Sequence, residues 1–352
     1  MIVMSMKDGW VYLLRERDFL TGTTDRYLKI GLTERDVEDR VKEHQTGNAR
    51  QVISVYERHV PLMSTMENHL HHVFSTDRIN GEWFDMDDDK VNNEVIPLIE
   101  ALADQQVVAK ADKERAAEVK KTYDNGKVRD PTPHETALHA DYVEAKHAHV
   151  RAKALHAIDN ARVRALIGSA QSIDGVVSIT AKPQGDQFDK ASFLASLTEA
   201  QRAQCYETVT QFSAGSVKVV GVKTLKTLDP QLDADKKAAE AAIATPLSLA
   251  NVGGAELART SDAEAAHMAY LASRRAVKEA EWDEERLAAA LLVALGEDRE
   301  ITGVVSCVRE DVTTENKWSA ALAKQHFPDA YAAHTKPRDD TFEVKINDGH
   351  PY

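Results

Sequence analysis

The residues best suited to chemistry lie early in the chain: Tyr12, Lys29, Arg40, Glu67 and His71. A carboxylate can hold a hard divalent cation, and an arginine can neutralise the charge that develops on phosphate oxygens. A tyrosine or a metal-bound water can handle a proton. Glu67 and His71 are four residues apart, so on a helix both side chains face the same way. Together these residue types suit the cleavage of a phosphodiester.

Each of these residues also has an ordinary structural interpretation. A tyrosine in an apolar strand is more often a core residue than a catalyst. Arg40 and Glu67 fit the solvated charges of helix surfaces, and Trp83 and Phe84 fit packing residues that close a domain. The functional interpretation therefore depends on the ordered set and not on any one residue.

Short elements are predicted to position the set. Apolar and alternating runs predict three strands, over residues 9–14, 27–33 and 51–60. Helices are predicted over Asp36–His44, with Thr33 as the N-cap, and over Thr65–Phe74. A small α/β unit of this kind would bring the five residues onto neighbouring elements.

The ordered motifs resemble the GIY-YIG nuclease superfamily, and in particular its phage open-reading-frame and meiotically-up-regulated-gene branch. The resemblance spans residues 9–86 and rests on five features: Gly9-x-x-Tyr12, Lys29-Ile30-Gly31, Arg40, Glu67-x-x-x-His71 and Gly81-Glu82-Trp83-Phe84. It implies a small mixed sheet flanked by helices and a metal-dependent endonuclease activity on DNA.

The resemblance also implies roles for single residues. Tyr12 would lie near the scissile phosphate, Arg40 would stabilise phosphate charge, and Glu67 would bind Mg²⁺ (or Mn²⁺). Lys29 stands where the wider superfamily has a second tyrosine, so Tyr12, Tyr27 and a metal-bound water remain open as the general base. His71 would contact phosphate or carry a proton. Further DNA contacts are expected from Tyr27, Thr33, Lys42 and Arg78.

The composition indicates a globular protein of two or three domains, since 43% of its 352 residues are hydrophobic and 29% are charged. Two cysteines that lie far apart, Cys205 and Cys307, argue against a disulfide scaffold or a zinc site and fit a reducing compartment. No apolar run approaches the roughly 18 residues of a membrane span, and Met1–Lys7 lacks the pattern of a signal peptide. A cytoplasmic protein without a membrane partner is expected.

The charge balance is unusual for a nuclease. The net charge is −13, and residues 1–105 alone contain 12 Lys and Arg against 20 Asp and Glu, a difference of −8. Proteins gain affinity for DNA by neutralising phosphates, so an acidic domain binds weakly unless its basic residues share one face. The balance favours a weak, metal-dependent or partner-delivered nuclease.

The sequence after this unit predicts a helix and then a linker. The acidic run from Asp85 to Asp89 is expected to begin a helix that ends near Ala103. Residues 106–129 favour an extension of the helix and a turn at Asp124–Gly126, and the two prolines Pro131 and Pro133 then break the chain. The expected domains are therefore 1–105 (nuclease-like) and 106–135 (a charged linker, or alternatively a basic arm that touches nucleic acid).

The remainder of the chain contains an internal repeat. Residues 139–178 align without a gap with 267–306, and eight identities remain after alanines are discounted, including the run Gly-Val-Val-Ser. Each copy predicts a long helix ended by a glycine, Gly168 or Gly296, then a strand. A short helix ending near Tyr206 or Tyr331 and a last strand complete each copy. The copies span 136–226 and 264–352, with a linker over 227–263 that contains a short helix at 233–244.

The repeats are similar to the accessory segment of YqaJ-type phage recombination exonucleases, most clearly in copy two at Phe327-Pro328-Asp329-Ala330-Tyr331 and Phe342-Glu343-Val344-Lys345. This resemblance implies recruitment to DNA or to a recombination or replication protein, and both resemblances point to a phage or mobile element.

The expected fold class is α/β (α+β), with a GIY-YIG-like sheet followed by two helix–strand–helix–strand repeats. Besides the DNA endonuclease, two alternatives stay open: a non-catalytic DNA-binding module, and a protein that binds a partner through its repeats.

Overall fold

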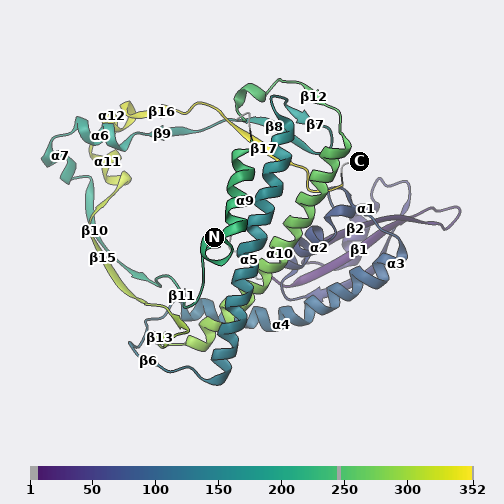
Figure 1. Ribbon diagram of the computed structural model, residues 1–352, viewed down its shortest axis with the longest axis horizontal. Helices are drawn as coiled ribbons and strands as arrows, with labels where there is room; N and C mark the ends of the chain where they lie inside the picture. The colour runs from purple at the N-terminus through teal and green to yellow at the C-terminus, as the bar shows by residue number, and fades with distance from the viewer. Residues whose placement is uncertain (1–6, 244–246, 351–352) are drawn as a thin grey trace.

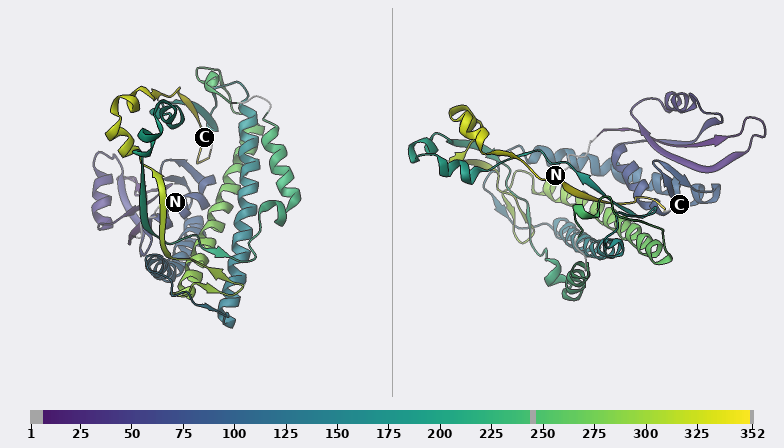
Figure 2. Two further views of the ribbon diagram at one scale, coloured as in Figure 1. Left: turned by 90° about the vertical axis from the view of Figure 1, so that its left-hand side faces the viewer. Right: turned by 90° about the horizontal axis from the view of Figure 1, so that it is seen from above.

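The computed structural model describes residues 7–243 and 247–350 and has an α/β (α+β) fold, in which long helices separate several small sheets (Figure 1). An antiparallel sheet from the start of the chain lies on one side of the long helices, and two narrow ribbons arch away on the other side (Figures 1 and 2). Within the described residues, no helix is both long and apolar enough to cross a membrane.

The N-terminal sheet has five antiparallel strands in the order β3-β1-β2-β5-β4. They are β1 Gly9–Arg17, β2 Thr24–Thr33, β3 Gln51–Val60, β4 Arg78–Asn80 and β5 Trp83–Asp85. Alternate side chains of a strand point to opposite faces. Tyr12 therefore packs on the face covered by helix α1 (Val37–Gln45), and Val11 packs on the face covered by α2 (Met63–Val73).

These elements confirm the predicted strands and helices but not Thr33 as the predicted N-cap of the first helix. The hydroxyl of Thr33 accepts a hydrogen bond from the Arg35 amide at 3.0 Å, in a turn that precedes the helix. Asp36 is the N-cap of α1, because its carboxylate accepts a hydrogen bond from the Glu38 amide at 2.9 Å.

The helix that follows the sheet is longer than expected. Asp87 caps it by accepting a hydrogen bond from the Lys90 amide at 2.9 Å. Then α3 (Asp88–Lys90), a π-helical turn (Val91–Val95) and α4 (Ile96–Val119) follow one another without a break, so the helix does not end near residue 103.

Residues 106–135, expected to form a charged linker, are mostly regular structure. The second half of α4 packs on a helix of the repeats, and Trp282 of that helix is buried against Leu62 and Ala109. The predicted turn at Asp124–Gly126 forms, with a φ of 74° at its glycine. Strand β6 (Val128–Arg129) follows directly. The nuclease-like sheet is thus fixed to the repeats.

Two long helices form the centre of the repeats, α5 (Pro133–Ile167) and α10 (Ser261–Leu295). They run antiparallel, because Lys146 and His149 both contact Glu284 while His156, further along α5, contacts Ser273. The prediction that a glycine ends each helix is confirmed, since the φ values at the two C-caps are 54° at Gly168 and 57° at Gly296.

The two copies exchange strands. In one sheet, β7 (Ser172–Ile173) and β8 (Val177–Lys182) of copy one lie between β12 (Glu256–Leu257) and β17 (Thr341–Ile346), which come from the linker and copy two. The other sheet has the order β11-β14-β13-β6. Its two central strands, β13 (Glu300–Ile301) and β14 (Val305–Ser306), belong to copy two. Of the two outer strands, β11 (Lys218–Val219) belongs to copy one and β6 precedes copy one. The sequence predicted that each copy is a self-contained helix–strand–helix–strand unit. The structure shows that neither copy is, because each completes its sheet with strands from outside itself.

The ribbons are also shared between the copies. Strand β10 (Tyr206–Ser213) pairs with β15 (Glu310–Trp318), and β9 (Asp186–Phe188) pairs with β16 (Thr335–Pro337). The ribbons meet at a distal cluster of four short helices around the buried Phe193 (Figure 1). These helices are α6 Lys190–Ser196, α7 Glu199–Ala203, α11 Ala320–His326 and α12 Pro328–Ala333. The predicted short helices that end near Tyr206 and Tyr331 are present as α7 and α12, and Tyr206 itself begins β10.

The expected linker over 227–263 also contains regular structure besides β12. Helices α8 (Leu225–Leu228) and α9 (Pro230–Ala241) pack along α5, so the predicted short helix forms a few residues earlier than expected.

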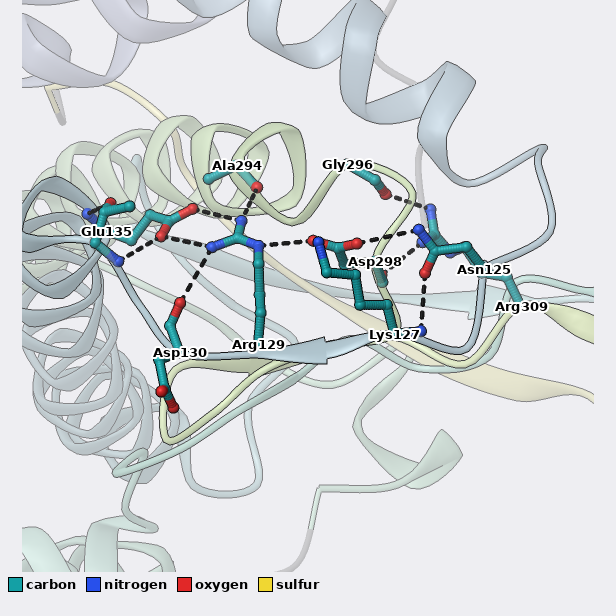
Figure 3. A network of polar contacts seen from close by, with 10 residues as sticks. Asn125, Lys127, Arg129, Asp130, Glu135, Ala294, Gly296, Asp298 and Arg309 are labelled. Carbon is teal, nitrogen blue, oxygen red and sulfur yellow. Dashed lines mark hydrogen bonds and ion pairs between the residues drawn. The ribbon is translucent and has the colours of Figure 1, made fainter.

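A polar network ties β6 to the end of α10 (Figure 3). The Arg129 guanidinium donates two hydrogen bonds to Glu135, at 2.9 and 2.7 Å, and one to Asp298 at 2.6 Å. The hydrogen bonds from Arg129 lower the pKa of Glu135 to about 2. The network therefore joins the segment before copy one to the first sheet strand of copy two.

Candidate functional site

Five elements of the N-terminal unit bring the candidate residues together. Strand β1 supplies Tyr12, strand β2 supplies Lys29, and helix α1 supplies Arg40. Helix α2 supplies Glu67 and His71, one turn apart, and the turn between β4 and β5 supplies Glu82. The charges of Arg40, Glu82 and Glu67 all act on the Tyr12 hydroxyl, so these groups share one site.

Tyr12 is 1% exposed and lies against the backbone of the next strand. Its hydroxyl shares a side-chain hydrogen bond with Arg40, which also donates to Glu43. Burial raises the pKa of Tyr12, and Arg40 only partly opposes this change. Tyr12 is therefore protonated at neutral pH and fixed in place beside Arg40. The Arg40 guanidinium uses one of its nitrogens for Glu43 on the same helix, so other N–H groups remain to bind a substrate.

Two carboxylates and a lysine form the other half of the site. The Lys29 ammonium lies 2.5 Å from Glu82 and 5.8 Å from the centre of the Trp83 ring. Burial alone would raise the pKa of Glu82, but Lys29 lowers it overall. Burial, followed by the charge of Glu82, raises the pKa of Glu67 to about 7, although Lys29 and Arg78 oppose the change. Glu67 is thus a carboxyl whose ionisation is disfavoured by burial and by the neighbouring charge of Glu82.

His71 lies at the site with one ring nitrogen already in use. Its Nε2 lies 3.0 Å from the backbone oxygen of Ile30, and its ring packs on Phe84 at 5.3 Å. Burial lowers the pKa of His71, so the ring is neutral at pH 7 and Nε2–H donates to the carbonyl. This contact favours a positioning role for His71 over the expected phosphate contact.

Two further residues, His44 and Glu82, lie at the site although they were not predicted as site residues. Within the described part of the chain the buried Nε2 of His44 has no hydrogen-bond partner, and its ring centre lies 6.5 Å from that of Tyr12. Burial, and then the charges of Lys29 and Arg40, lower the pKa of His44. The four-residue spacing from Arg40, the same as that of Glu67 and His71, is the sequence signal that could have identified His44.

The four expected DNA contacts separate into two groups. Tyr27 is 43% exposed and lies two residues before Lys29 on the same face of β2. Arg78 is half-buried, donates to the Gly81 carbonyl, and acts electrostatically on Glu67. The carbonyl of Arg78 accepts a hydrogen bond from the His350 amide at 2.8 Å, so the segment after β17 touches the edge of the site.

The other two expected contacts are not available to DNA at this site. Thr33 lies on the same face of β2 as Lys29, but it is 5% exposed and its hydroxyl accepts a hydrogen bond from the Arg35 amide. Lys42 lies two residues after Arg40 on α1, on the opposite side of the helix, where it pairs with Glu38 at 3.1 Å.

The carboxylates at the site fit a divalent cation held largely by water. The described residues contain no group of three or more His, Cys, Asp or Glu side chains that could hold a metal ion. Magnesium in particular keeps several waters and is bound through one or two carboxylates together with substrate phosphates. Glu67, whose pKa is raised beside Glu82, has no hydrogen-bond or ion-pair partner among the described residues. A cation at Glu67 would relieve the unfavourable ionisation of this carboxyl.

The absence of a side chain at Gly31 leaves room for the Tyr12 ring, and Gly31→Ala is expected to fill this room and destabilise the protein. An added Cβ would lie 2.5 Å from the Tyr12 hydroxyl oxygen, well inside van der Waals contact. The ring would have to move, so we expect a loss of about 1–3 kcal/mol in the free energy of unfolding, measured by urea denaturation. Gly185→Ala is the control, because a Cβ at Gly185 meets nothing within 4 Å. Equal stability of the two variants would contradict the close contact of Tyr12 and Gly31.

Comparison of the chain with protein families, with characterised proteins and with solved structures finds no match.

Proposed function

We propose that the chain is a metal-dependent endonuclease that hydrolyses phosphodiester bonds in DNA. The observation that carries the proposal is the pairing of a desolvated carboxyl, Glu67, with the Tyr12–Arg40 hydrogen bond across one site. A carboxyl with a raised pKa next to fixed cationic donors is typical of catalytic sites. The resemblance of the ordered motifs to the GIY-YIG superfamily supports the same conclusion.

The residues present suit an in-line attack of water on phosphorus, in which one P–O bond forms as the leaving P–O bond breaks. A cation bound at Glu67, Mg²⁺ or Mn²⁺, would neutralise phosphate charge and lower the pKa of a bound water. Arg40 donates to the phosphate oxygens as negative charge develops on them. The Tyr12 phenol, which stays protonated beside Arg40, helps to orient the phosphate.

His44 is the residue best suited to accept the proton of the attacking water. It is neutral at pH 7 because burial and two neighbouring cations lower its pKa, and none of the described residues hydrogen-bonds to its buried Nε2. A neutral imidazole is the usual general base of protein sites, and here the ring would have to turn toward the bound substrate. Tyr12 is less suited to this role, since its pKa is raised.

Cleavage of plasmid, linear and single-stranded DNA by the full chain tests the proposal. We expect cleavage with Mg²⁺ or Mn²⁺ and none with EDTA, and a loss of roughly a hundredfold or more in the Glu67→Ala variant. Glu118→Ala is the matched control, because Glu118 is an exposed glutamate on α4 that pairs with Lys121 of its own helix end. Cleavage that persists in EDTA or in Glu67→Ala would refute a metal-dependent site at Glu67.

The repeats are proposed to deliver this activity to DNA or to a recombination or replication protein. The β10–β15 ribbon supports binding to a partner, because all but the last residue of β15 is exposed, including Val312 at 42%. A complex formed through such a surface should tolerate added salt, whereas binding to DNA should weaken steeply as salt rises.

A further inference from the structure

A cavity of about 400 Å³ lies beside the candidate site and is not used by the mechanism above. Its walls are Glu16, Asp25, Tyr27, Ile79, Asn80 and Trp83. Three of these residues are apolar or aromatic, namely Tyr27, Ile79 and Trp83. The other three are polar and comprise two carboxylates and one amide. A volume of this size lies within the range of small-molecule sites and is large enough for one nucleoside.

The cavity lies on the sheet face that carries Tyr12 and Lys29. Tyr27 and Lys29 are two residues apart on β2, about 7 Å along the strand, and their side chains point to the same face. Trp83 is the register partner of Lys29 on β5, and the Lys29 ammonium lies over its ring. A nucleotide whose phosphate contacts Lys29 or Arg40 would therefore have its base within reach of Tyr27 and Trp83.

The charge of the cavity decides which part of a nucleotide can enter. Glu16 accepts a hydrogen bond from Asn48 at 2.7 Å, and Arg50 lies 3.9 Å from Glu16 and 3.8 Å from Asp25. A carboxylate accepts about four hydrogen bonds, so both retain free acceptor positions. Two carboxylates repel a phosphate, but they accept hydrogen bonds from the exocyclic amino groups of cytosine and adenine.

We propose that this cavity holds one unpaired nucleobase with an exocyclic amino group, next to the phosphodiester that is cut. The inference rests on the proposed function for the position of the phosphate. The base stacks on Tyr27 and Trp83, and its amino group donates to Glu16 or Asp25. A base inside a duplex would have to leave its stack to enter, at a cost of a few kcal/mol. The substrate is therefore single-stranded or locally unpaired DNA, and thymine, which has no amino group, is disfavoured at this position.

Binding of short fluorescent oligonucleotides tests the inference without cleavage. The Glu67→Gln chain in EDTA is titrated with oligo-deoxycytidine, oligo-deoxyadenosine and oligo-thymidine, and affinity is read by anisotropy. We expect thymidine to bind roughly 5-fold or more weakly than the other two, from the loss of a hydrogen-bonded amino group. Tyr27→Ala should weaken all three by roughly 5- to 150-fold, from the loss of stacking, and Tyr27→Phe should bind as the parent does. Glu16→Gln with Asp25→Asn should reduce the preference over thymidine.

Phe19→Ala is the control, because Phe19 is 62% exposed on the hairpin after β1 but lies outside the cavity. The proposal is overturned if Phe19→Ala weakens binding as much as Tyr27→Ala does. It is also overturned if the Tyr27 and Glu16/Asp25 variants bind like the parent with no preference among bases; metal-dependent cleavage by the wild type would then leave the nuclease intact. A third outcome is that the wild type cuts no DNA, although binding depends on Tyr27 and shows the base preference. This outcome supports the cavity as a base-binding site and refutes the proposed nuclease activity.

Discussion

Glu67→Gln is expected to make the protein more stable above neutral pH while it removes the capacity to cleave DNA. The carboxyl has a pKa of about 7 in the folded protein, against an ordinary value near 4.5. Folding therefore opposes ionisation of this group. The penalty is absent below pH 4.5, grows between pH 4.5 and 7, and is complete above pH 7. The neutral glutamine avoids the penalty, and because Glu67 is partly open to solvent we expect a gain of about 1–2 kcal/mol at pH 8.

Urea denaturation in EDTA at pH 8 and at pH 5 measures this effect. The variant should exceed the wild type clearly at pH 8 and much less at pH 5. Added Mg²⁺ should then stabilise the wild type and not the variant, because a cation restores favourable ionisation of Glu67. Glu118→Gln, at an exposed position, should differ little from the wild type at either pH. A wild type and Glu67→Gln of equal stability at pH 8 would show that the carboxyl is not desolvated.

Arg309→Met is expected to give the largest loss of stability. The Arg309 side chain is 1% exposed, and its guanidinium donates to the carbonyls of Val119, Gly296 and Asp298 at 2.9, 2.8 and 2.8 Å. Figure 3 shows this guanidinium beside Gly296 and Asp298. Val119 ends α4, Gly296 is the C-cap of α10, and Asp298 lies in the turn that follows, so Arg309 binds carbonyls that have no partner inside a helix. Methionine fills similar space but deprives Gly296 and Asp298 of this donor, whereas Val119 keeps the Thr122 hydroxyl at 3.0 Å, and we expect a loss of about 3–5 kcal/mol.

The free energy of unfolding from urea denaturation checks this value. Arg338→Met, at an exposed position between β16 and β17, should stay within about 0.5 kcal/mol of the wild type. A similar, small effect of both substitutions would mean that water replaces the Arg309 guanidinium and that the helix ends are not sealed.

The N-terminal unit was predictable because its signals are local. Its strands alternate or are continuously apolar over many residues, and the spacing of Glu67 and His71 specifies a shared helix face. The N-cap of α1 was misplaced because Thr33 and Asp36 both suit an N-cap, and only the chain path decides between them. His44 was overlooked because its only local signal is the four-residue spacing from Arg40, which many pairs of polar residues on a surface helix share.

The exchange of strands between the repeats could not be predicted from the sequence. Strands β6, β7, β12 and β13 have two residues each, too few for an alternating pattern. The run Gly-Val-Val-Ser occurs in both copies, so the pattern fits a partner strand from either copy equally well. The choice depends on the antiparallel packing of α5 and α10, a contact between residues far apart in the sequence.

The exchanged strands make the two copies equivalent to a homodimer whose subunits have been fused into one polypeptide. Trp282, which packs on Leu62 and Ala109 of the N-terminal part of the chain, has Ala154 at the corresponding position of copy one. The two copies therefore differ at the position through which copy two holds the N-terminal sheet. A truncation before β17 would remove the neighbour of β8 in copy one and, through Asn347 and His350, the contacts to α10 and to Arg78. Strand β17 and the residues that follow it therefore connect three separate parts of the molecule: copy one, helix α10 and the N-terminal sheet.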